Sequence, residues 1–331
     1  MSAVDFRLVP GDLGHHGDGL SRPECVLCLS DGTVITSNSV GGVSVVAPNG
    51  GRRDIIGQRD GLPPVATNGF ALTGAGDFLL ADLHGDGGGV WRLTQVGDLS
   101  PLLLEIDGVA LPSTNFVGVD HQDRIWITIS TRHDPRDLAY RTDVADGYII
   151  LMDDLSKSDG GARIVADGLG YTNEAIVDPS GQWLYVNETF ARLTSRYRIQ
   201  DGGLGRRETF VEYGPGTFPD GLAFDEEGAF WMTSVVSNRV IRVTLDRRQH
   251  IVIEENNPDH LAVVEAAFQA GELGRPHLDK IPSEIMQSIS SIAFGGPDRR
   301  TAYLGNLLDS KLYTFQVPVA GATPAHWHVR L

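Results

Sequence analysis

Residues 220–234 read DGLAFDEEGAFWMTS: a polar start, an apolar strand, an acidic turn with a glycine, and a second apolar strand. Apolar strands joined by Asp- and Gly-containing turns are typical of β-hairpins. The same pattern recurs until the chain holds six copies, which indicates a repeat architecture. The copies begin at Glu24 (ECVLCLSDGTVITSN), Asn68 (NGFALTGAGDFLLAD), Asn115 (NFVGVDHQDRIWITIS), Asn173 (NEAIVDPSGQWLYVNET), Asp220 and Ser291 (SIAFGGPDRRTAYLGN).

The spacing of the copies predicts how many strands each repeat contains. Successive copies start 44, 47, 58, 47 and 71 residues apart, and the shorter intervals are close to one four-stranded propeller blade. Further strand-like segments follow each copy, such as GVWRL at 89–93 and RVIRV at 239–243. We therefore predict an all-β chain, folded as one six-bladed β-propeller domain over residues 1–331. A closed ring of blades leaves few exposed strand edges.

The strand that closes the ring of blades is not determined by this pattern. The segment AHWHVRL at 325–331 would complete the sixth blade, or the segment DFRLV at 5–9 would supply its outer strand. Both alternatives stay open, because each is a short strand-like segment near one end of the chain.

The longest interval, between the fifth and sixth copies, contains a helical segment. Asn257 and Pro258 read as a helix cap followed by proline at the first helical position. We predict a short helix over 258–272 that either packs on the blades for stability or acts as a lid. Apolar residues recur at helical spacing and a glycine ends the run: Leu261, Val264, Phe268, and then Gly271 or Gly274.

A second excursion, STRHDPRDLAYRTDVADGY at 130–148, interrupts the third blade. Loops carry function more often than the scaffold strands do, so this loop is a candidate pocket wall.

Composition and charge exclude several classes of protein. The 331 residues carry 27 Lys and Arg against 43 Asp and Glu, a formal charge of −16, which repels nucleic acid and anionic membranes. No stretch approaches 18 apolar residues, and the N-terminus lacks the features of a secretory signal. With only Cys25 and Cys28 there is no disulfide scaffold, and we interpret both as core residues. We predict a cytoplasmic location.

The polar residue that opens each copy has a defined place in such a fold. The innermost strand of every blade lines the central channel, so equivalent positions lie on a ring around the axis. Two carboxylates and three amides are costly to bury there without a partner, and a hard cation such as Ca²⁺ satisfies these oxygen donors. The alternative is that they cap a water-filled channel. The six predicted positions are Glu24, Asn68, Asn115, Asn173, Asp220 and Ser291.

A second polar tier follows where the second strand of each copy ends. There are three alternatives for these side chains: they support the residues that open the copies, they contact substrate, or they only start the next loop. Its members are Asn38, Asp82, Ser130, Asn187, Glu188, Ser234 and Asn306.

At these residues the chain resembles the family of gluconolactonase, regucalcin (senescence marker protein) and luciferin-regenerating enzyme, over roughly residues 20–320. That family comprises metal-dependent lactone hydrolases on six-bladed propellers. The matching signatures are Pro23-Glu24, Asn115 with Asp120 and QDRIW at 122–126, YTN at 171–173 before DPSGQWLYV, FPDGLAFDEEGAFW at 218–231, and SIAFGGPD from 291.

The resemblance implies that Glu24, Asn173 and Asp220 are the metal ligands and that Asn115 lies beside the metal, facing the substrate. It also implies one divalent ion, with Ca²⁺ expected first and Zn²⁺, Mn²⁺, Mg²⁺ or Fe²⁺ as alternatives. Asn68 is a further candidate substrate-binding residue.

This chain departs from the sugar-lactone members in two places. They tend to carry an arginine two residues before the Asn115 position, where this chain has Ser113. The loop after Thr128 is also long and charged, and it contains Arg132 and His133. We take Ser113, Arg132 and His133 as candidate substrate-binding residues. These differences argue against an aldonolactone and favour another lactone or an ester.

We therefore expect a carboxylic-ester hydrolase that opens a small lactone with metal-activated water. Asp220 is the candidate general base, and Asn115 the candidate donor to the developing oxyanion. Two alternatives remain. The chain is a non-catalytic calcium- or partner-binding propeller, or it is a related propeller enzyme that catalyses isomerisation or cyclisation.

Overall fold

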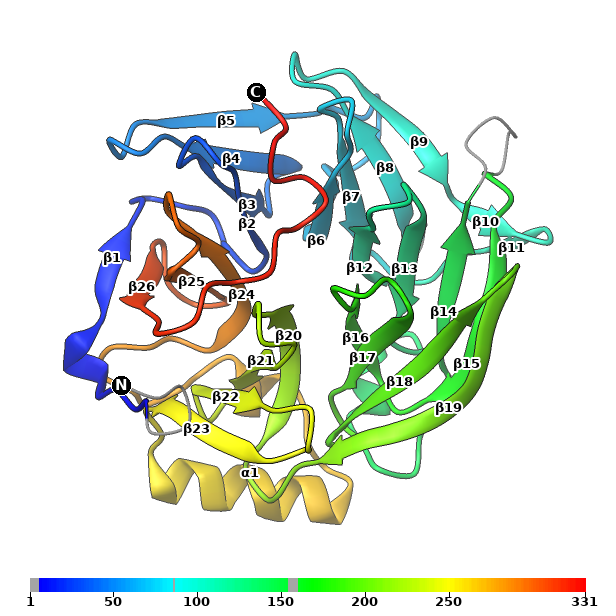
Figure 1. Cartoon of the computed structure of the whole chain (residues 1–331). Helices are drawn as coiled ribbons and strands as arrows, with labels where there is room; N and C mark the ends of the chain where they lie inside the picture. The colour runs from blue at the N-terminus through cyan, green and yellow to red at the C-terminus, as the bar shows by residue number, and fades with distance from the viewer. Residues whose placement is uncertain (1–5, 86, 154–159) are drawn as a thin grey trace.

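The computed structural model describes residues 6–85, 87–153 and 160–331. Within these ranges, six four-stranded antiparallel sheets stand around a central axis (Figure 1). A small separate hairpin, β10 (Glu105–Ile106) with β11 (Val109–Ala110), follows the second blade. The predicted six-bladed β-propeller is confirmed.

In the first five blades the strands follow one another in chain order from the channel outward. Blade one has β2 (Val26–Cys28), β3 (Val34–Asn38), β4 (Gly42–Val46) and β5 (Arg52–Ile56). Blade two has β6 (Thr67–Leu72), β7 (Phe78–Asp82), β8 (Gly89–Leu93) and β9 (Leu99–Leu103). Blade three has β12 (Thr114–Val119), β13 (Ile125–Ile129), β14 (Gly147–Met152) and β15 (Arg163–Leu169). Blade four has β16 (Thr172–Val177), β17 (Trp183–Glu188), β18 (Leu193–Gln200) and β19 (Gly203–Glu212). Blade five has β20 (Phe218–Phe224), β21 (Phe230–Val235), β22 (Arg239–Val243) and β23 (Gln249–Glu254).

The sixth blade joins the two ends of the chain. It contains β24 (Ile289–Gly295), β25 (Thr301–Asn306) and β26 (Leu312–Gln316), and its outermost strand is β1 (Gly14–His16). His15 of β1 lies opposite Tyr313 of β26. Neither segment proposed from the sequence closes the ring: 325–331 and 6–9 form no strand, and residue 5 lies outside the described ranges. The N-terminal side does supply the closing strand, but from residues further along.

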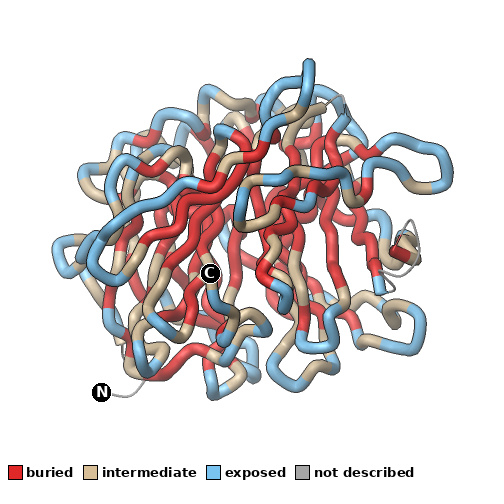
Figure 2. Tube along the Cα trace, turned by 90° about the horizontal axis from the view of Figure 1, so that it is seen from above, coloured by how far each residue is buried: buried red, intermediate tan, exposed pale blue. Residues whose placement is uncertain are grey.

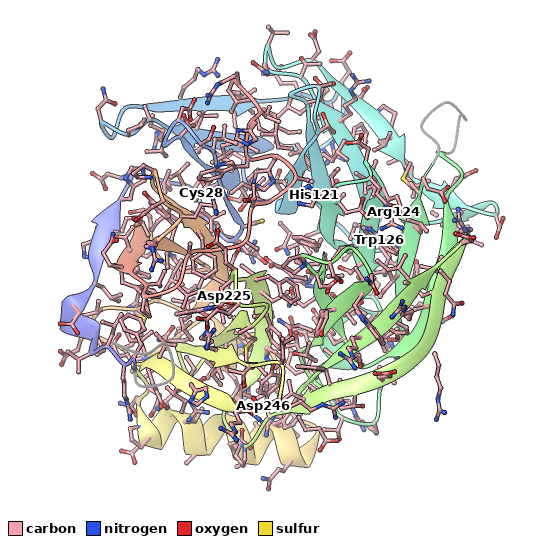
Figure 3. All side chains as sticks on the ribbon, viewed as in Figure 1. Cys28, His121, Arg124, Trp126, Asp225 and Asp246 are labelled. Atoms are coloured by element: carbon pink, nitrogen blue, oxygen red, sulfur yellow. The ribbon has the colours of Figure 1, made fainter. Side chains whose placement is uncertain are left out.

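Aspartates build the turns between first and second strands. Asp120 Oδ1 accepts the backbone N–H groups of Gln122 and Arg124 at 2.8 and 3.1 Å, and its Oδ2 accepts the indole N–H of Trp126 at 2.9 Å. Asp225 makes the equivalent bonds in blade five. Figure 3 labels Arg124 beside Trp126 on blade three. These aspartates in the repeat therefore hold hairpins together, because their side chains satisfy turn N–H groups that no strand partner reaches.

The apolar core lies between neighbouring blades. Every residue of the second strands β7, β13 and β21 is buried. Between blades three and four, Trp126 packs in one cluster with Ala175, Leu184 and Tyr197. Figure 2 shows the same distribution along the chain: buried strands inside, and exposed loops at the rims. The blades thus bury both faces of their sheets, which fixes the inner strands around the channel.

The insertion between blades five and six is a helix, as predicted. Helix α1 (Pro258–Ala270) begins after Asn257, whose side chain accepts a first-turn backbone N–H at 3.0 Å. It ends at Gly271, which is left-handed with φ 71°. Val264 and Phe268 are its buried residues. The other helical elements of the described residues are α2 (Arg275–Leu278) and the 3-10 turns η1 (Pro10–Asp12) and η2 (Arg136–Ala139). None of the described helices is long and apolar enough to cross a membrane.

The inner strands carry irregularities near their starts. The register with the second strand shifts between Thr172 and Ala175 in β16, and likewise at the start of β6, β12, β20 and β24. A β-bulge re-aims side chains and is frequent beside active sites. Here the bulges place two successive side chains of some inner strands towards the channel, among them Asn173 and Glu174.

Candidate functional site

The starts of the inner strands converge on the channel axis. Five of the six positions predicted from the repeat line one small pocket, and the sixth is shifted by one residue. The register shift between Ile289 and Ser291 brings Ser290, rather than the predicted Ser291, to this level. We call the six residues the channel ring: Glu24, Asn68, Asn115, Asn173, Asp220 and Ser290.

Hydrogen bonds from side chains to backbone tie the blades together around the channel ring. Asn68 Nδ2 donates to the Asn115 carbonyl at 2.9 Å, which joins blade two to blade three. Ser290 Oγ donates to the Glu24 carbonyl at 2.8 Å, which joins blade six to blade one. Similar bonds run from Ser130 to the Thr172 carbonyl, from Asn187 to the Asp220 carbonyl and from Thr233 to the Ser290 carbonyl. The positions of the ring residues are therefore fixed by neighbouring blades.

Several residues of the predicted second polar tier form hydrogen bonds to the inner strands that carry the channel ring. Asn187 Nδ2 donates to the carbonyls of Asp220 and Gly221 at 2.9 and 3.2 Å. Ser130 holds the start of β16, and Ser234 Oγ accepts the N–H of Phe218 at 2.8 Å. These residues orient the strands that carry the ring, which is the supporting role expected around a metal or catalytic site.

Negative charge is concentrated in the channel ring. Glu24 and Asp220 are only 8% and 6% exposed. Burial raises the pKa of Asp220 well above its usual value, and the nearby carboxylates of Glu24 and Glu174 raise it further. Because each carboxylate disfavours the ionisation of the others, the arrangement calls for a positive partner.

A guanidinium provides part of that positive charge. Arg22 Nη1 forms an ion pair with Glu24 Oε2, and it donates a hydrogen bond to Asn68 Oδ1 at 3.1 Å. Arg22 adopts φ 50°, a left-handed conformation that is unfavourable for a residue with a side chain. The chain thus holds this arginine beside the ring at some backbone cost.

The oxygen atoms of the ring fit a divalent cation. Apart from the ionic contact with Arg22, Glu24 Oε2 accepts no hydrogen bond from the described residues, and neither does the buried Asn115 Oδ1. Asn173 Nδ2 donates to Thr189 Oγ1 at 3.1 Å, and the Asn173 side chain lines the same pocket as Glu24 and Asp220. Buried oxygen donors without partners, of the carboxylate and amide type, are what Ca²⁺ binds. Among the described residues, no three His, Cys, Asp or Glu side chains are arranged to hold a metal ion by themselves, so amides complete the donor set.

The remaining candidate substrate-binding residues lie outside this pocket. Arg132 pairs with Asp167 at 2.8 Å, and His133 Nδ1 lies 2.9 Å from Asp146 Oδ2. Ser113 Oγ donates to the Leu83 carbonyl at 2.9 Å. None of Arg132, His133 or Ser113 lines the pocket that the channel ring forms.

Glu174 was not singled out in the sequence. Strict alternation along β16 would turn it away from the channel when Asn173 faces it, but the bulge turns both inward. Burial raises the pKa of Glu174 to about 8. Gly221 lets β20 approach both β24 and this side chain, since a Cβ there would lie 2.5 Å from the Ser290 carbonyl oxygen and 3.2 Å from the Glu174 carboxyl carbon.

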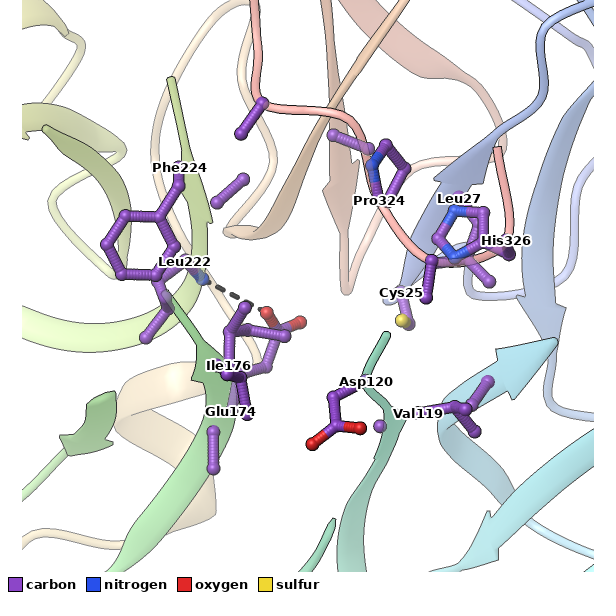
Figure 4. A pocket seen from close by; sticks show the side chains of 18 of the residues that line it. Cys25, Leu27, Val119, Asp120, Glu174, Ile176, Leu222, Phe224, Pro324 and His326 are labelled. Atoms are coloured by element: carbon purple, nitrogen blue, oxygen red, sulfur yellow. Dashed lines mark hydrogen bonds between the residues drawn. The ribbon is translucent and has the colours of Figure 1, made fainter. Parts of the chain in front are cut away.

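Beyond Glu174 the channel widens into an apolar cavity of about 170 Å³. Figure 4 shows Glu174 and Cys25 at this cavity and the hydrogen bond from Leu222 to Glu174. Pro324 and His326, from the segment after the last strand, also line this cavity. The channel therefore has two parts: a polar ring at one end and an apolar cavity at the other, with Glu174 lining both.

The sequence is similar to a known protein family and to two curated proteins. Residues 27–264 match the family model described as the SMP-30/Gluconolactonase/LRE-like region. A 6-deoxy-6-sulfogluconolactonase of Pseudomonas putida is 28% identical over 54% of this chain and 57% of its own length. The pentonolactonase XacC of Haloferax volcanii is 28% identical over 49% of this chain and 46% of its own length. The matches thus span about half the length of these curated relatives.

Solved structures share the architecture. A gluconolactonase of Xanthomonas campestris superimposes with a TM-score of 0.65 at 18% identity, covering 91% of this chain and 88% of that one. The calcium-binding protein regucalcin of Agrobacterium tumefaciens gives a TM-score of 0.65 at 15% identity, covering 96% and 99%. At these identities the likeness is one of fold.

Proposed function

Because this chain belongs to the SMP-30/gluconolactonase/LRE-like family, we propose that it hydrolyses a lactone, or a related ester, at the channel ring. One observation carries the proposal: two buried carboxylates, Glu24 and Asp220, face amide groups of which one, Asn115, has an acceptor oxygen with no partner among the described residues. Such a set is unfavourable by itself and is stabilised by a bound cation.

We assign Glu24, Asn173 and Asp220 as the residues that hold a divalent cation, with Ca²⁺ favoured because every donor is an oxygen. A cation at this place supplies Lewis-acid polarisation of a carbonyl and lowers the pKa of water. The structural neighbour regucalcin, described as a calcium-binding protein, supports this choice of ion.

Two residues of the chain have proposed roles in the chemistry. Asp220 takes the proton from the attacking water, because its carboxyl group lies in the channel ring among the residues proposed to hold the cation, within reach of a water bound there. Asn115 donates its amide hydrogens to the oxygen that becomes negative when the carbonyl is attacked. The backbone carbonyls of Asn115 and Asp220 accept hydrogen bonds from neighbouring blades, so the backbone that carries these two side chains needs little reorganisation during the reaction.

The substrate is proposed to be a small lactone. The two curated relatives are named for sugar lactones, but Ser113 stands here where sugar-lactone members tend to carry an arginine. We therefore extend the proposal to lactones other than the aldonolactones and to activated esters.

The test is turnover of a panel of lactones and esters before and after chelation. We expect hydrolysis to be lost with EDTA and restored by Ca²⁺ or Mn²⁺, and Asn173→Ala to lower it at least about tenfold, since a ligand is removed. Asn49→Ala, which changes an amide in an exposed turn, is the matched control and should behave like the unaltered protein. Undiminished turnover after complete metal removal would refute the proposal.

A non-catalytic calcium-binding propeller is the second candidate. The same ring residues would bind the ion, but the panel would show no turnover, whereas calorimetry would show Ca²⁺ binding that Asn173→Ala weakens. Isomerisation or cyclisation by a related enzyme would appear as a product of unchanged mass, which mass spectrometry separates from the hydrolysed acid.

A further inference from the structure

The loop that interrupts blade three lies on the face of the propeller at which the inner strands begin, where it contacts blades two and four. At one end it approaches blade two, where a Cβ built on Gly85 would lie 2.6 Å from Asp134 Oδ1. At the other end the Tyr140 ring lies 5.3 Å from the ring of Tyr171, two residues before Asn173. The turn η2 lies between these two contacts and begins at Arg136.

Packing keeps this loop in place. Ala139 and Tyr140 belong to one buried cluster with Tyr171 and Phe190 of blade four and with Phe268 of α1. The Tyr140 and Phe190 rings are 4.4 Å apart. The loop and α1 are thus joined by an apolar contact on the face that carries the channel ring, and Arg136 is attached to a rigid support.

Arg136 has no hydrogen bond or ion pair within the described part of the chain, unlike Arg132 and Arg141 of the same loop. Burial opposes its charge, but its tyrosine neighbours, Tyr171 and Tyr140, and then the carboxylates of Glu24 and Asp220 raise its pKa. The Arg136 guanidinium is therefore charged and close enough to interact with the carboxylates of Glu24 and Asp220, and its donor groups have no partner among the described residues.

The charge balance changes when a cation enters the ring. Without one, the carboxylates of Glu24 and Asp220 are matched by the guanidinium groups of Arg22 and Arg136. A divalent cation held by the same carboxylates neutralises them, so the two guanidinium groups then outnumber Glu174, the remaining acid that lines the ring. The local surplus is positive although the whole chain has a formal charge of −16. Such a surplus, at the mouth of a partly closed pocket, attracts an anion.

We propose that the substrate is an anionic lactone, with a carboxylate or a comparable oxyanion attached to its ring, and that Arg136 binds this group while Arg22 supplies the second positive charge. This inference rests on the lactonase proposal, which it narrows. The planar fork of a guanidinium pairs with two oxygens of a carboxylate, so a charged substituent would be both attracted and oriented. Its position would be set from Arg136, and the lactone carbonyl would then face Asn115.

Binding of unreactive ring compounds tests the inference without turnover. The probes are 3-oxocyclopentane-1-carboxylate and the neutral 3-oxocyclopentane-1-carboxamide, titrated calorimetrically into the Ca²⁺-loaded protein. We expect the carboxylate to bind at least about tenfold more tightly, as a charge-assisted pair adds to affinity, and the preference to shrink at 0.5 M NaCl because salt screens the pair.

Variants of the loop locate the effect. Arg136→Gln should abolish the preference for the carboxylate, and Arg136→Lys should restore part of it, since charge returns without the planar fork. Arg141→Gln is the matched control: Arg141 lies on the same loop, is 43% exposed and pairs with Asp143, so the preference should persist. Melting temperatures of all variants establish that they are folded.

Equal binding of the two probes, no binding of the carboxylate, or a preference that survives in Arg136→Gln would overturn the inference. The lactone panel is assayed separately on the same samples. A protein that hydrolyses neutral lactones with no preference for the charged probe keeps the proposed function and loses the anion site. A protein that binds the carboxylate through Arg136 but hydrolyses nothing keeps the anion site and loses the proposed function.

Discussion

The carboxyl group of Glu174 accepts a hydrogen bond from the backbone N–H of Leu222 at 3.0 Å, and this bond joins blade four to blade five where the polar and apolar parts of the channel meet. An acid buried at such a boundary has consequences for stability. Burial raises the pKa of Glu174 to about 8, from an ordinary value of 4.5. The folded protein therefore keeps a proton at neutral pH that the unfolded chain releases.

Replacing Glu174 by Gln should change how stability depends on pH. In the native protein, stability is lost as pH rises from about 4.5 to about 8, because only the unfolded chain ionises in that window. Gln keeps an acceptor for Leu222 and does not ionise. In EDTA, the free energy of unfolding of Glu174→Gln, taken relative to that of the unaltered protein, should rise by about 3–5 kcal/mol from pH 5 to pH 8. Urea unfolding of both proteins at pH 5 and at pH 8 measures this change. The same difference in unfolding free energy at both pH values would contradict a raised pKa for Glu174.

His326 should give a pH dependence of the opposite sign. Burial, with a smaller contribution from His121, lowers the pKa of His326 to about 4. Below pH 6.5 the unfolded chain binds a proton that the folded protein does not, so stability falls as pH drops from 6.5 to 4. His326→Gln should lessen this acid-induced fall in the free energy of unfolding by about 1–2 kcal/mol. This is less than the full pKa shift implies, because the side chain is only partly buried. His328→Gln, at an exposed position of the same segment, should leave the acid loss unchanged when unfolding is followed at pH 7.5 and 4.5.

Glu24→Gln should weaken metal binding while preserving the fold. The substitution keeps the shape and removes one of the two buried charges that attract the cation, so we expect the affinity for Ca²⁺ to fall at least about tenfold. Calorimetry gives the affinity, and the rise of melting temperature on adding Ca²⁺ should shrink in parallel. Glu227→Gln changes an exposed glutamate of blade five and should show the native response. Native affinity in Glu24→Gln would remove Glu24 from the ligand set.

Asn115→Ala separates catalysis from metal binding. If Asn115 donates to the developing oxyanion, its removal should lower kcat about 100-fold with little change in KM. The Ca²⁺ content, measured by atomic emission, should stay at the native level because Asn115 is not among the proposed ligands. A variant that loses metal and activity together would instead place Asn115 in the metal site.

Much of the architecture could be predicted from the sequence because each blade repeats a local pattern. The polar residues that open the repeats gave five of the six ring positions, and the cap at Asn257 with Gly271 defined α1. These features depend on residues that are close in the sequence, so they can be predicted from a local pattern.

Other features depend on contacts between distant segments or on local irregularity, and the pattern did not contain them. The inward position of Glu174 and the exchange of Ser291 for Ser290 both result from bulges, which break the alternation assumed for a strand. The closing strand at 14–16 has a glycine and two histidines, which carry no strand signal. Arg136 lies near the ring because of tertiary packing of Tyr140, which the spacing of residues in a loop does not reveal.

The pairing of β1 with β26 also bears on how the protein acquires its structure. Gly14 lies opposite Thr314, so the outermost strand of the last blade waits for almost the whole chain to be synthesised. Pairing over such a separation has a high entropic cost and forms slowly. Until then β26 presents an open edge, along which another copy can add a strand. The growing chain is therefore most vulnerable to aggregation at its latest step, and a circular permutant cut between β1 and β2, with all four strands of the sixth blade contiguous, would avoid that delay.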